Sequence, residues 1–369
     1  MHFGEPLEDE RLLALYRPDD RIRTVLTADV YGQGEADALL GRALEGLKRD
    51  AYCLVGAVGH DFYGGERQGP KGFPRFTDPA LRGPDQYASY MRMATERSLE
   101  RIGVDSFDLL LLHNPDRTGY SSEQVWDGMR ALRDAGLTEL IGVAPGPANG
   151  FTLDLIDCFE RFGEAIDWAM VILNPLEPWP GELVLPAAER HGVKVISRVV
   201  DYGGLFHDDV LPGHQFPRFD HRSFRPPGWV EEGREKLERM RPFADRYRLT
   251  MLQLACEWNL AHTAVGCVVP TLIQEAGPDA KPIEAKRDEL AALSLAANGP
   301  DAERGSPLDP SDIAQIRAIG DNTGCMALKG ASPDYEGDAL PDRWALDDEL
   351  VGVAARWDIH PGEQLVQTH

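Results

Sequence analysis

The sequence contains few cysteines, and their spacing indicates neither a disulfide framework nor a metal site. The five cysteines are Cys53, Cys158, Cys256, Cys267 and Cys325, with no CxxC pair and no histidine at a ligand spacing. Disulfide-stabilised secreted domains are short and dense in cysteine, and structural zinc sites need closely spaced Cys and His ligands. We therefore predict free thiols and no bound metal.

Positive charge is also scarce. The chain has 38 Lys and Arg against 61 Asp and Glu, which gives a formal net charge of -23. Nucleic acids and anionic membranes are bound by clustered Lys and Arg side chains. The composition therefore indicates neither of these partners and favours a small-molecule ligand, while it leaves the oligomeric state open.

Long apolar runs are absent as well. No stretch approaches the roughly 18 apolar residues that a membrane-spanning helix needs, and the opening MHFGEPLEDERLL has no basic-then-apolar targeting pattern. By elimination we expect a cytoplasmic location. With 43% hydrophobic residues, the chain can nevertheless bury a large core as one α/β barrel.

Short apolar runs alternate with segments of helical period, which is typical of repeated βα units. The predicted strands are MHF at the start and residues 23–28, 51–57, 107–113, 140–144, 168–173, 193–199 and 265–270. The predicted helices span residues 7–17, 34–48, 84–102, 122–135, 151–163, 183–191, 231–247 and 250–261. Eight strands alternating with eight helices predict a (β/α)8 TIM barrel. A doubly wound sheet is the alternative, but no predicted strand is followed by GxGxxG.

Two loops and a tail depart from this regular pattern. Residues 60–83 and 201–229 are long, rich in Gly, Pro and aromatic residues, and follow strands at the C-terminal face of the barrel. Long ordered loops at this face usually build the substrate pocket. We assign residues 1–295 to the barrel and residues 296–369 to a C-terminal extension that packs on it, with no predicted role.

Two strand ends carry contiguous motifs, LTADVYGQGEADALLGRAL (26–44) and DLLLLHNPD (108–116). Together with the stretches RSLERIGVDSFDLLLLH and MRALRDAGLTELIGV, they resemble in order the motifs of the aldo-keto reductase superfamily. The resemblance covers about residues 3–300 and implies a TIM barrel that reduces carbonyls with NADPH through an Asp, Tyr, Lys and His tetrad. Tyr31 matches the proton-donating tyrosine, and His113 matches the histidine that orients the carbonyl.

The other half of that tetrad is replaced. Leu26 stands where the family has Asp, and Ala57 stands where it has the Lys that lowers the pKa of the tyrosine. A phenol with a pKa near 10 exchanges protons poorly at neutral pH unless a cation stabilises its phenolate. The resemblance therefore indicates a divergent member of the superfamily.

The coenzyme contacts that the resemblance implies are also largely replaced. The altered positions are Ala144 and Pro145 for Ser-Asn, Met170 for Gln, Arg198 for the aromatic ring that stacks on the nicotinamide, and Thr271 for the Gly of the phosphate turn. A Cβ where backbone must approach phosphate closely argues against dinucleotide binding. Lys286 and Arg287 are the candidate coenzyme ligands if NADP is bound; otherwise we expect no cofactor.

Arg198 would place a fixed positive charge near Tyr31. It would then replace the missing lysine or hold a substrate oxyanion. The alternative is a salt bridge with Asp201 that closes an empty site. Asp29 is either a substitute carboxylate at the substrate or a cap for the turn before the next helix.

The candidate site extends into the two long loops. His60 and His207 open these loops as possible general bases or as surface residues, and the aromatic residues there would form a wall for a ring-bearing or sugar-like ligand. The candidate catalytic residues are Tyr31, His113, Arg198 and His60. The candidate substrate-binding residues are Asp29, Trp179, Tyr202, Phe206, His207 and Trp229.

Three functions remain open at this point. The first is a redox-neutral lyase, dehydratase or isomerase that acts on a hydroxy-carbonyl compound by Tyr31 and His113 acid-base chemistry, without a cofactor. The second is a divergent NADP-dependent reductase. The third is a non-catalytic binding barrel, because a fold can outlive its activity.

Overall fold

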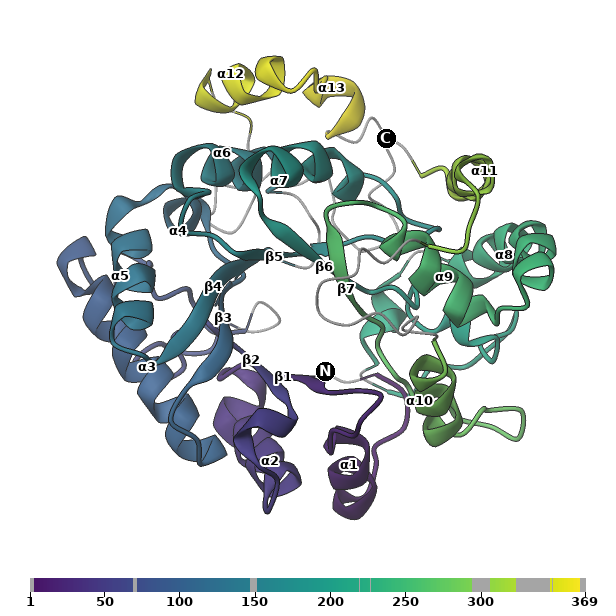
Figure 1. Ribbon diagram of the computed structural model, residues 1–369, viewed down its shortest axis with the longest axis horizontal. Coiled ribbons are helices and arrows are strands. Elements are labelled where there is room, and N and C mark those ends of the chain that lie inside the picture. The colour runs from purple at the N-terminus through teal and green to yellow at the C-terminus, as the bar shows by residue number, and fades with distance from the viewer. Residues whose placement is uncertain are drawn as a thin grey trace.

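The computed structural model describes residues 3–68, 72–146, 151–218, 220–225, 227–293, 306–322, 346 and 348–365. Seven strands form one parallel sheet in the order of the chain. They are β1 (Thr24–Leu26), β2 (Cys53–Val58), β3 (Phe107–His113), β4 (Thr138–Ala144), β5 (Trp168–Ile172), β6 (Lys194–Arg198) and β7 (Val265–Val269). The sheet curls around an interior, and the helices cover its outside (Figure 1).

The helices follow the strands as the βα pattern predicts. They are α1 (Asp9–Tyr16), α2 (Glu35–Leu44), α3 (Tyr87–Ile102), α4 (Arg117–Ser121), α5 (Glu123–Asp134), α6 (Thr152–Phe162), α7 (Leu185–His191), α8 (Trp229–Tyr247), α9 (Met251–Leu260) and α10 (Ile283–Ala291), followed by α11 (Pro310–Gly320), α12 (Asp348–Arg356) and α13 (Pro361–Gln364). The predicted (β/α)8 fold class is confirmed. The expected first strand MHF is not seen: Phe3 lies in a bend, and residues 1–2 lie outside the described residues.

Alternation along the strands divides the core into two parts. Inward-facing side chains form an apolar cluster inside the barrel: Ala28, Val55, Ala57, Leu109, Leu111, Ala144, Met170 and Ile196. A larger cluster fills the space between the sheet and the helices. Because side chains two residues apart on a strand share a face, His113 follows Leu111 inward and Arg198 follows Ile196. Both polar side chains therefore lie above an apolar floor at the C-terminal ends of their strands.

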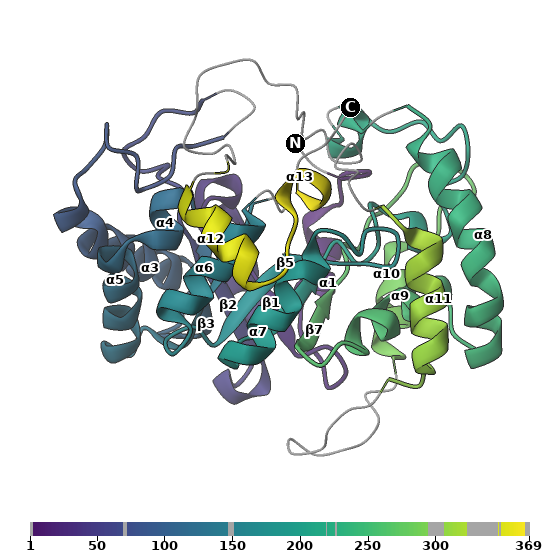
Figure 2. The ribbon, with the colours of Figure 1, turned by 90° about the horizontal axis from the view of Figure 1, so that it is seen from above.

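The C-terminal segments pack on the outside of the barrel (Figure 2). Arg246 of α8 pairs with Asp312 of α11 at 2.6 Å, and Arg356 of α12 pairs with Glu160 of α6 at 2.5 Å. The predicted boundary between residues 295 and 296 lies outside the described residues. None of the described helices has the length and apolar character that crossing a membrane requires.

Candidate active site

A tight turn after β1 presents Tyr31 at the C-terminal face of the barrel. The turn Tyr31–Gly34 contains Gly32 at φ 59° and Gly34 at φ 98°. A Cβ at Gly34 would lie 2.5 Å from the Nε of Arg101, so both the backbone conformation and the close approach favour glycine. Tyr31 is 51% exposed, which makes it accessible to a ligand.

His113 ends β3 directly beside Tyr31. The two ring centroids are 5.7 Å apart with an edge-to-face angle of 89°. Burial, together with His60 and Arg198 nearby, lowers the pKa of His113 well below its usual value. The imidazole is therefore neutral at neutral pH. Its Nδ1 is buried without a hydrogen-bond partner.

His60 lies 5.2 Å from His113 between ring centroids. Its Nδ1 contacts the carbonyl of Phe73 at 2.9 Å, and its Nε2 contacts the amide nitrogen of Asn114 at 3.1 Å. These contacts assign the proton to Nδ1, which donates to Phe73, while Nε2 accepts from Asn114. Burial and the charge of Arg75 lower the pKa of His60 to about 4. His60 thus lies beside the site, but both ring nitrogens are engaged, so the structure does not support it as a free general base.

Arg198 ends β6 and reaches across the barrel mouth. One terminal nitrogen donates to the carbonyls of Pro145 at 2.8 Å and Gly146 at 2.7 Å. The expected alternative, a salt bridge to Asp201, is wrong, because the Asp201 oxygens accept from the backbone N–H of Thr271 and Gly204 at 2.7 and 2.9 Å.

Left-handed backbone follows both inward-facing polar residues. Val199, directly after Arg198, has φ 58°, and Asn114, directly after His113, has φ 46°. This conformation is unusual for a β-branched residue and costs of order 1–3 kcal/mol. Such strain is most often kept at functional sites, where it turns the chain sharply after a side chain that must point inward.

Tyr31 and Arg198 interact electrostatically. Desolvation raises the pKa of the Tyr31 hydroxyl, and the positive charge of Arg198 lowers it in part. The residue is half exposed, so its desolvation is partial. At neutral pH the phenol therefore keeps its proton, and the positive charge of Arg198 favours the phenolate form in part.

The two tetrad positions that differ from the family are part of the apolar floor. Ala57 belongs to the interior cluster, and Leu26 packs against it. Met170, which stands in place of the family's Gln, belongs to the same cluster. The loss of the carboxylate and the ammonium is therefore compensated by packing, and Arg198 on the opposite wall is the cation that approaches Tyr31.

Asp29 lies on the other side of β1. Neither of its carboxylate oxygens has a hydrogen-bond partner, and the residue is 0% exposed. Burial and the nearby charge of Asp37 raise its pKa well above the usual value. The residue at the start of α2 in the N-cap position is Gly34. The predictions that Asp29 contacts substrate or caps this turn therefore find no support, because it lies in the layer between β1 and the helices.

The predicted aromatic wall is buried in the packing of the long loop. The buried residues are Trp179, Tyr202, Phe206 and Trp229, together with His207, whose Nε2 contacts the carbonyl of Thr271 at 2.8 Å. A small cavity between Tyr202, Trp229 and helix α8 lies away from Tyr31. These side chains hold the loop on the barrel in this structure and do not line an open surface at the mouth.

The two predicted coenzyme cations are already paired within the protein. Lys286 is fully buried, lies 2.6 Å from Asp209 and donates to the carbonyl of Ile273 at 2.5 Å. Arg287 lies 2.8 Å from Asp19 and fixes α10 to the segment after α1. Neither side chain is free to meet a phosphate.

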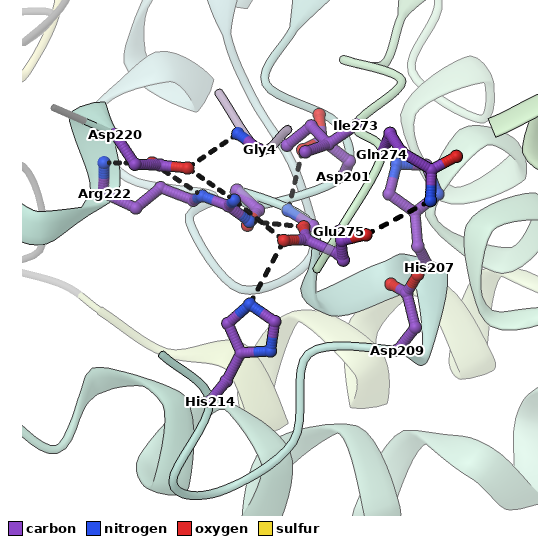
Figure 3. A network of polar contacts seen from close by, with 12 residues as sticks. Gly4, Asp201, His207, Asp209, His214, Asp220, Arg222, Ile273, Gln274 and Glu275 are labelled. Atoms are coloured by element: carbon purple, nitrogen blue, oxygen red, sulfur yellow. Dashed lines mark hydrogen bonds and ion pairs between the residues drawn. The ribbon is translucent and has the colours of Figure 1, made fainter. Parts of the chain in front are cut away.

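A buried ion cluster that no sequence motif predicts joins the loops after β6 and β7. Arg222 lies between Asp220 and Glu275 (Figure 3). Its nitrogens are 2.7 Å from Asp220 and 2.5 Å from Glu275, and all three side chains are 0% exposed. His214 lies 3.2 Å from Glu275, and the Gly4 N–H donates to Asp220 at 2.7 Å. The cluster holds the long loop closed over this side of the barrel.

Two residues at the mouth were also not predicted. Arg75 donates to the backbone carbonyl of Asn114 and lies 3.2 Å from the Nδ1 of His60. Asn114 immediately follows His113, and this adjacency was an available signal. Arg75 belongs to no motif in the loop 60–83, and only the folding of this loop brings it to the site.

The fold and these residues define a (β/α)8 barrel with a tyrosine, a histidine and an arginine at the mouth, which is the place where TIM-barrel enzymes carry their active sites. The model of the aldo/keto reductase family matches residues 10–276. The chain belongs to the aldo/keto reductase family, and the resemblance inferred from the sequence is confirmed.

Individual relatives are distant. The chain is 23% identical over 262 residues to a probable voltage-gated potassium channel subunit beta of Arabidopsis thaliana, covering 67% of this chain and 73% of the relative. It is 26% identical over 203 residues to a D-threo-aldose 1-dehydrogenase of Pseudomonas sp, covering 51% and 58%. It is 32% identical over 126 residues to a 6-dehydroglucose reductase of Agrobacterium fabrum, covering 33% and 39%.

Solved structures show the same fold. A glycerol dehydrogenase of Gluconobacter oxydans has a TM-score of 0.62 at 21% identity and covers 86% of each chain. An aldo/keto reductase of Klebsiella pneumoniae in complex with NADP and acetate has a TM-score of 0.56 at 19% identity and covers 86% of this chain and 87% of its own. At these identities the likeness establishes the architecture of the barrel.

Proposed function

We propose that the chain is an oxidoreductase that interconverts a carbonyl and a hydroxyl group on a small hydroxy-carbonyl molecule. The observation that carries this proposal is the grouping of Tyr31, His113 and Arg198 at the mouth of an aldo/keto reductase barrel. Relatives named as a dehydrogenase and a reductase of sugars support it. The NADP complex of the Klebsiella neighbour favours NADP(H) as hydride partner over the expectation of no cofactor.

The side chains of this chain account for the proton in such a reaction. Tyr31, held neutral, donates its proton to the carbonyl oxygen as negative charge develops there. Neutral His113 lies at the edge of the phenol ring and orients that oxygen. Arg198 stabilises the negative charge that remains on the Tyr31 oxygen, which is the role that the resemblance assigns to a lysine.

The two ends of the site differ in how well they fit the coenzyme. The reacting end fits carbonyl chemistry. The end that would bind the coenzyme phosphates, at Thr271 and Lys286, does not fit the contacts that the resemblance implies. The Thr271 N–H already donates to Asp201, and the Lys286 ammonium already pairs with Asp209.

This misfit favours a second candidate function. A redox-neutral lyase, dehydratase or isomerase needs the same proton donor and the same cation, but no hydride and no phosphate grip. The occupied contacts at Thr271 and Lys286 are the observation that supports it.

Titration with NADPH separates the two candidates. Quenching of the tryptophan fluorescence that saturates at micromolar NADPH is expected for the oxidoreductase, followed by NADPH oxidation with sugar aldehydes or ketones. No binding at millimolar NADPH would rule out the oxidoreductase in favour of the redox-neutral enzyme. In either case Tyr31→Phe should lose at least about 100-fold in kcat, because the proton donor is removed, at an unchanged melting temperature.

A further inference from the structure

Arg198 is a charged side chain without an acidic partner. In the part of the chain that the structure describes, no carboxylate forms a salt bridge with its guanidinium, and its hydrogen bonds go to the neutral carbonyls of Pro145 and Gly146. Glu177 acts on it electrostatically without a salt bridge. The two carbonyls fix the orientation of the guanidinium and contribute no negative charge of their own.

Part of the hydrogen-bonding capacity of Arg198 is also unused. Its Nε is buried and has no acceptor. Both hydrogen bonds of the guanidinium leave from a single terminal nitrogen, so the other terminal nitrogen has no acceptor among the described residues either. A guanidinium has five N–H donors in a planar fork that matches a carboxylate. Arg198 is thus held in place with donors left for a ligand.

This arrangement is costly without a ligand. The guanidinium lies above the apolar side chains of Ala144, Met170 and Ile196, and burial lowers its pKa. Arg198 is partly exposed, but its Nε is buried. A partly buried charge still loses hydration, so such arginines are normally paired with carboxylates. The strained backbone of Val199 adds to the cost at the same point. A structural role would be served better by an uncharged side chain.

We propose that Arg198 binds a carboxylate of the substrate, and that the substrate is a short 2-oxo acid or 2-hydroxy acid. This rests on the proposed function, in which the carbonyl oxygen lies between Tyr31 and His113. Arg198 acts electrostatically on both of these residues, so we place the acid group on the carbon next to the carbonyl, on the side that faces Arg198. Arg75, which contacts His60 beside His113, adds positive potential at the same mouth.

A matched pair of ligands tests the proposal without turnover. Isothermal titration of the full chain with pyruvate and with its neutral analogue pyruvamide compares an acid with an amide of nearly the same shape. We expect pyruvate to bind at least about ten-fold tighter, as charge-assisted hydrogen bonds require. Arg198→Met should abolish this preference, and Arg198→Lys should keep part of it as a point charge.

The matched control is Arg239→Met, because Arg239 lies exposed on α8 and its loss changes the net charge equally. Equal binding of pyruvate and pyruvamide to the wild-type chain would overturn the proposal, even if Arg198→Met fails to fold. So would an acid preference that survives in Arg198→Met, or binding of inorganic phosphate without binding of pyruvate.

The same samples separate this proposal from the proposed function. An Arg198-dependent preference for pyruvate without any NADPH oxidation supports the carboxylate site and removes the oxidoreductase. NADPH oxidation with neutral sugar aldehydes and no preference for the acid supports the oxidoreductase and removes the carboxylate site.

Discussion

Replacing Asp29 with asparagine should stabilise the fold at neutral pH and leave it unchanged in acid. Asp29 is fully buried without a hydrogen-bond partner. Its pKa is raised well above the usual value by burial and by Asp37. Arg101 and the N–H of Val30 lower the pKa of Asp29 only in part, because two nitrogens of Arg101 donate to Asp37 at 3.1 and 2.9 Å. The carboxyl group therefore gains a proton on folding, and an uncharged amide of the same size needs none.

The sign and the size follow from proton linkage. Because the folded-state pKa is raised, the folded chain keeps a proton that the unfolded chain releases above its pKa of about 3.9. Asp29 therefore does not lower the free energy of unfolding below pH 4. The free energy of unfolding falls as the pH rises from there toward the folded-state pKa. Holding the carboxyl group protonated at pH 7 costs about 4 kcal/mol at most. Asp29→Asn should recover a part of this cost.

Urea unfolding at pH 4.5, 6 and 8 measures the effect. The gain in unfolding free energy of Asp29→Asn over the wild-type chain should grow with pH across this range. Asp37→Asn is the contrasting variant, because it breaks the Asp37–Arg101 pair and should destabilise by about 3 kcal/mol. A gain for Asp29→Asn that is constant with pH, or a loss at every pH, would show that Asp29 is ionised and paired.

Three further predictions concern the site and its loops. Arg198→Met should shift the alkaline limb of the kcat/KM profile to higher pH, because Arg198 lowers the pKa of Tyr31. Lys286→Met should lower the free energy of unfolding in urea by about 3–5 kcal/mol, because it leaves Asp209 buried and unpaired. Gly34→Ala should lower the free energy of unfolding, measured by thermal unfolding, by about 1–2 kcal/mol. It should also reduce activity, because the turn that presents Tyr31 is displaced.

We propose that the site keeps the proton-transfer half of the family mechanism and takes its positive charge from another strand. Leu26 and Ala57 pack into the barrel floor where the family has an acid and a base. Arg198, which comes from the opposite strand wall, supplies a cation to the same phenol. The two changes belong together, because an apolar floor cannot hold the original ion pair and the phenol still needs a positive charge.

The sequence by itself determined the barrel, the strand ends and the first two site residues. Few folds other than a barrel accommodate apolar runs of four to seven residues with helical segments between them. Side chains alternate between the two faces of a strand with a period of two residues, which is a local property. This alternation along β3 and β6 therefore also predicted that His113 and Arg198 lie on the inner face. Tyr31 and His113 were predicted because each belongs to a contiguous motif.

Only the tertiary structure decided which partners these side chains have. Arg198 bonds to Pro145 and Gly146 rather than to Asp201, and His60 has both ring nitrogens engaged. Lys286 forms an ion pair with Asp209. Each of these contacts joins loops far apart in the sequence, and a loop's path over the barrel depends on how its own buried charges are paired. Local periodicity carries no information about that pairing, because it is a property of the packed loops together.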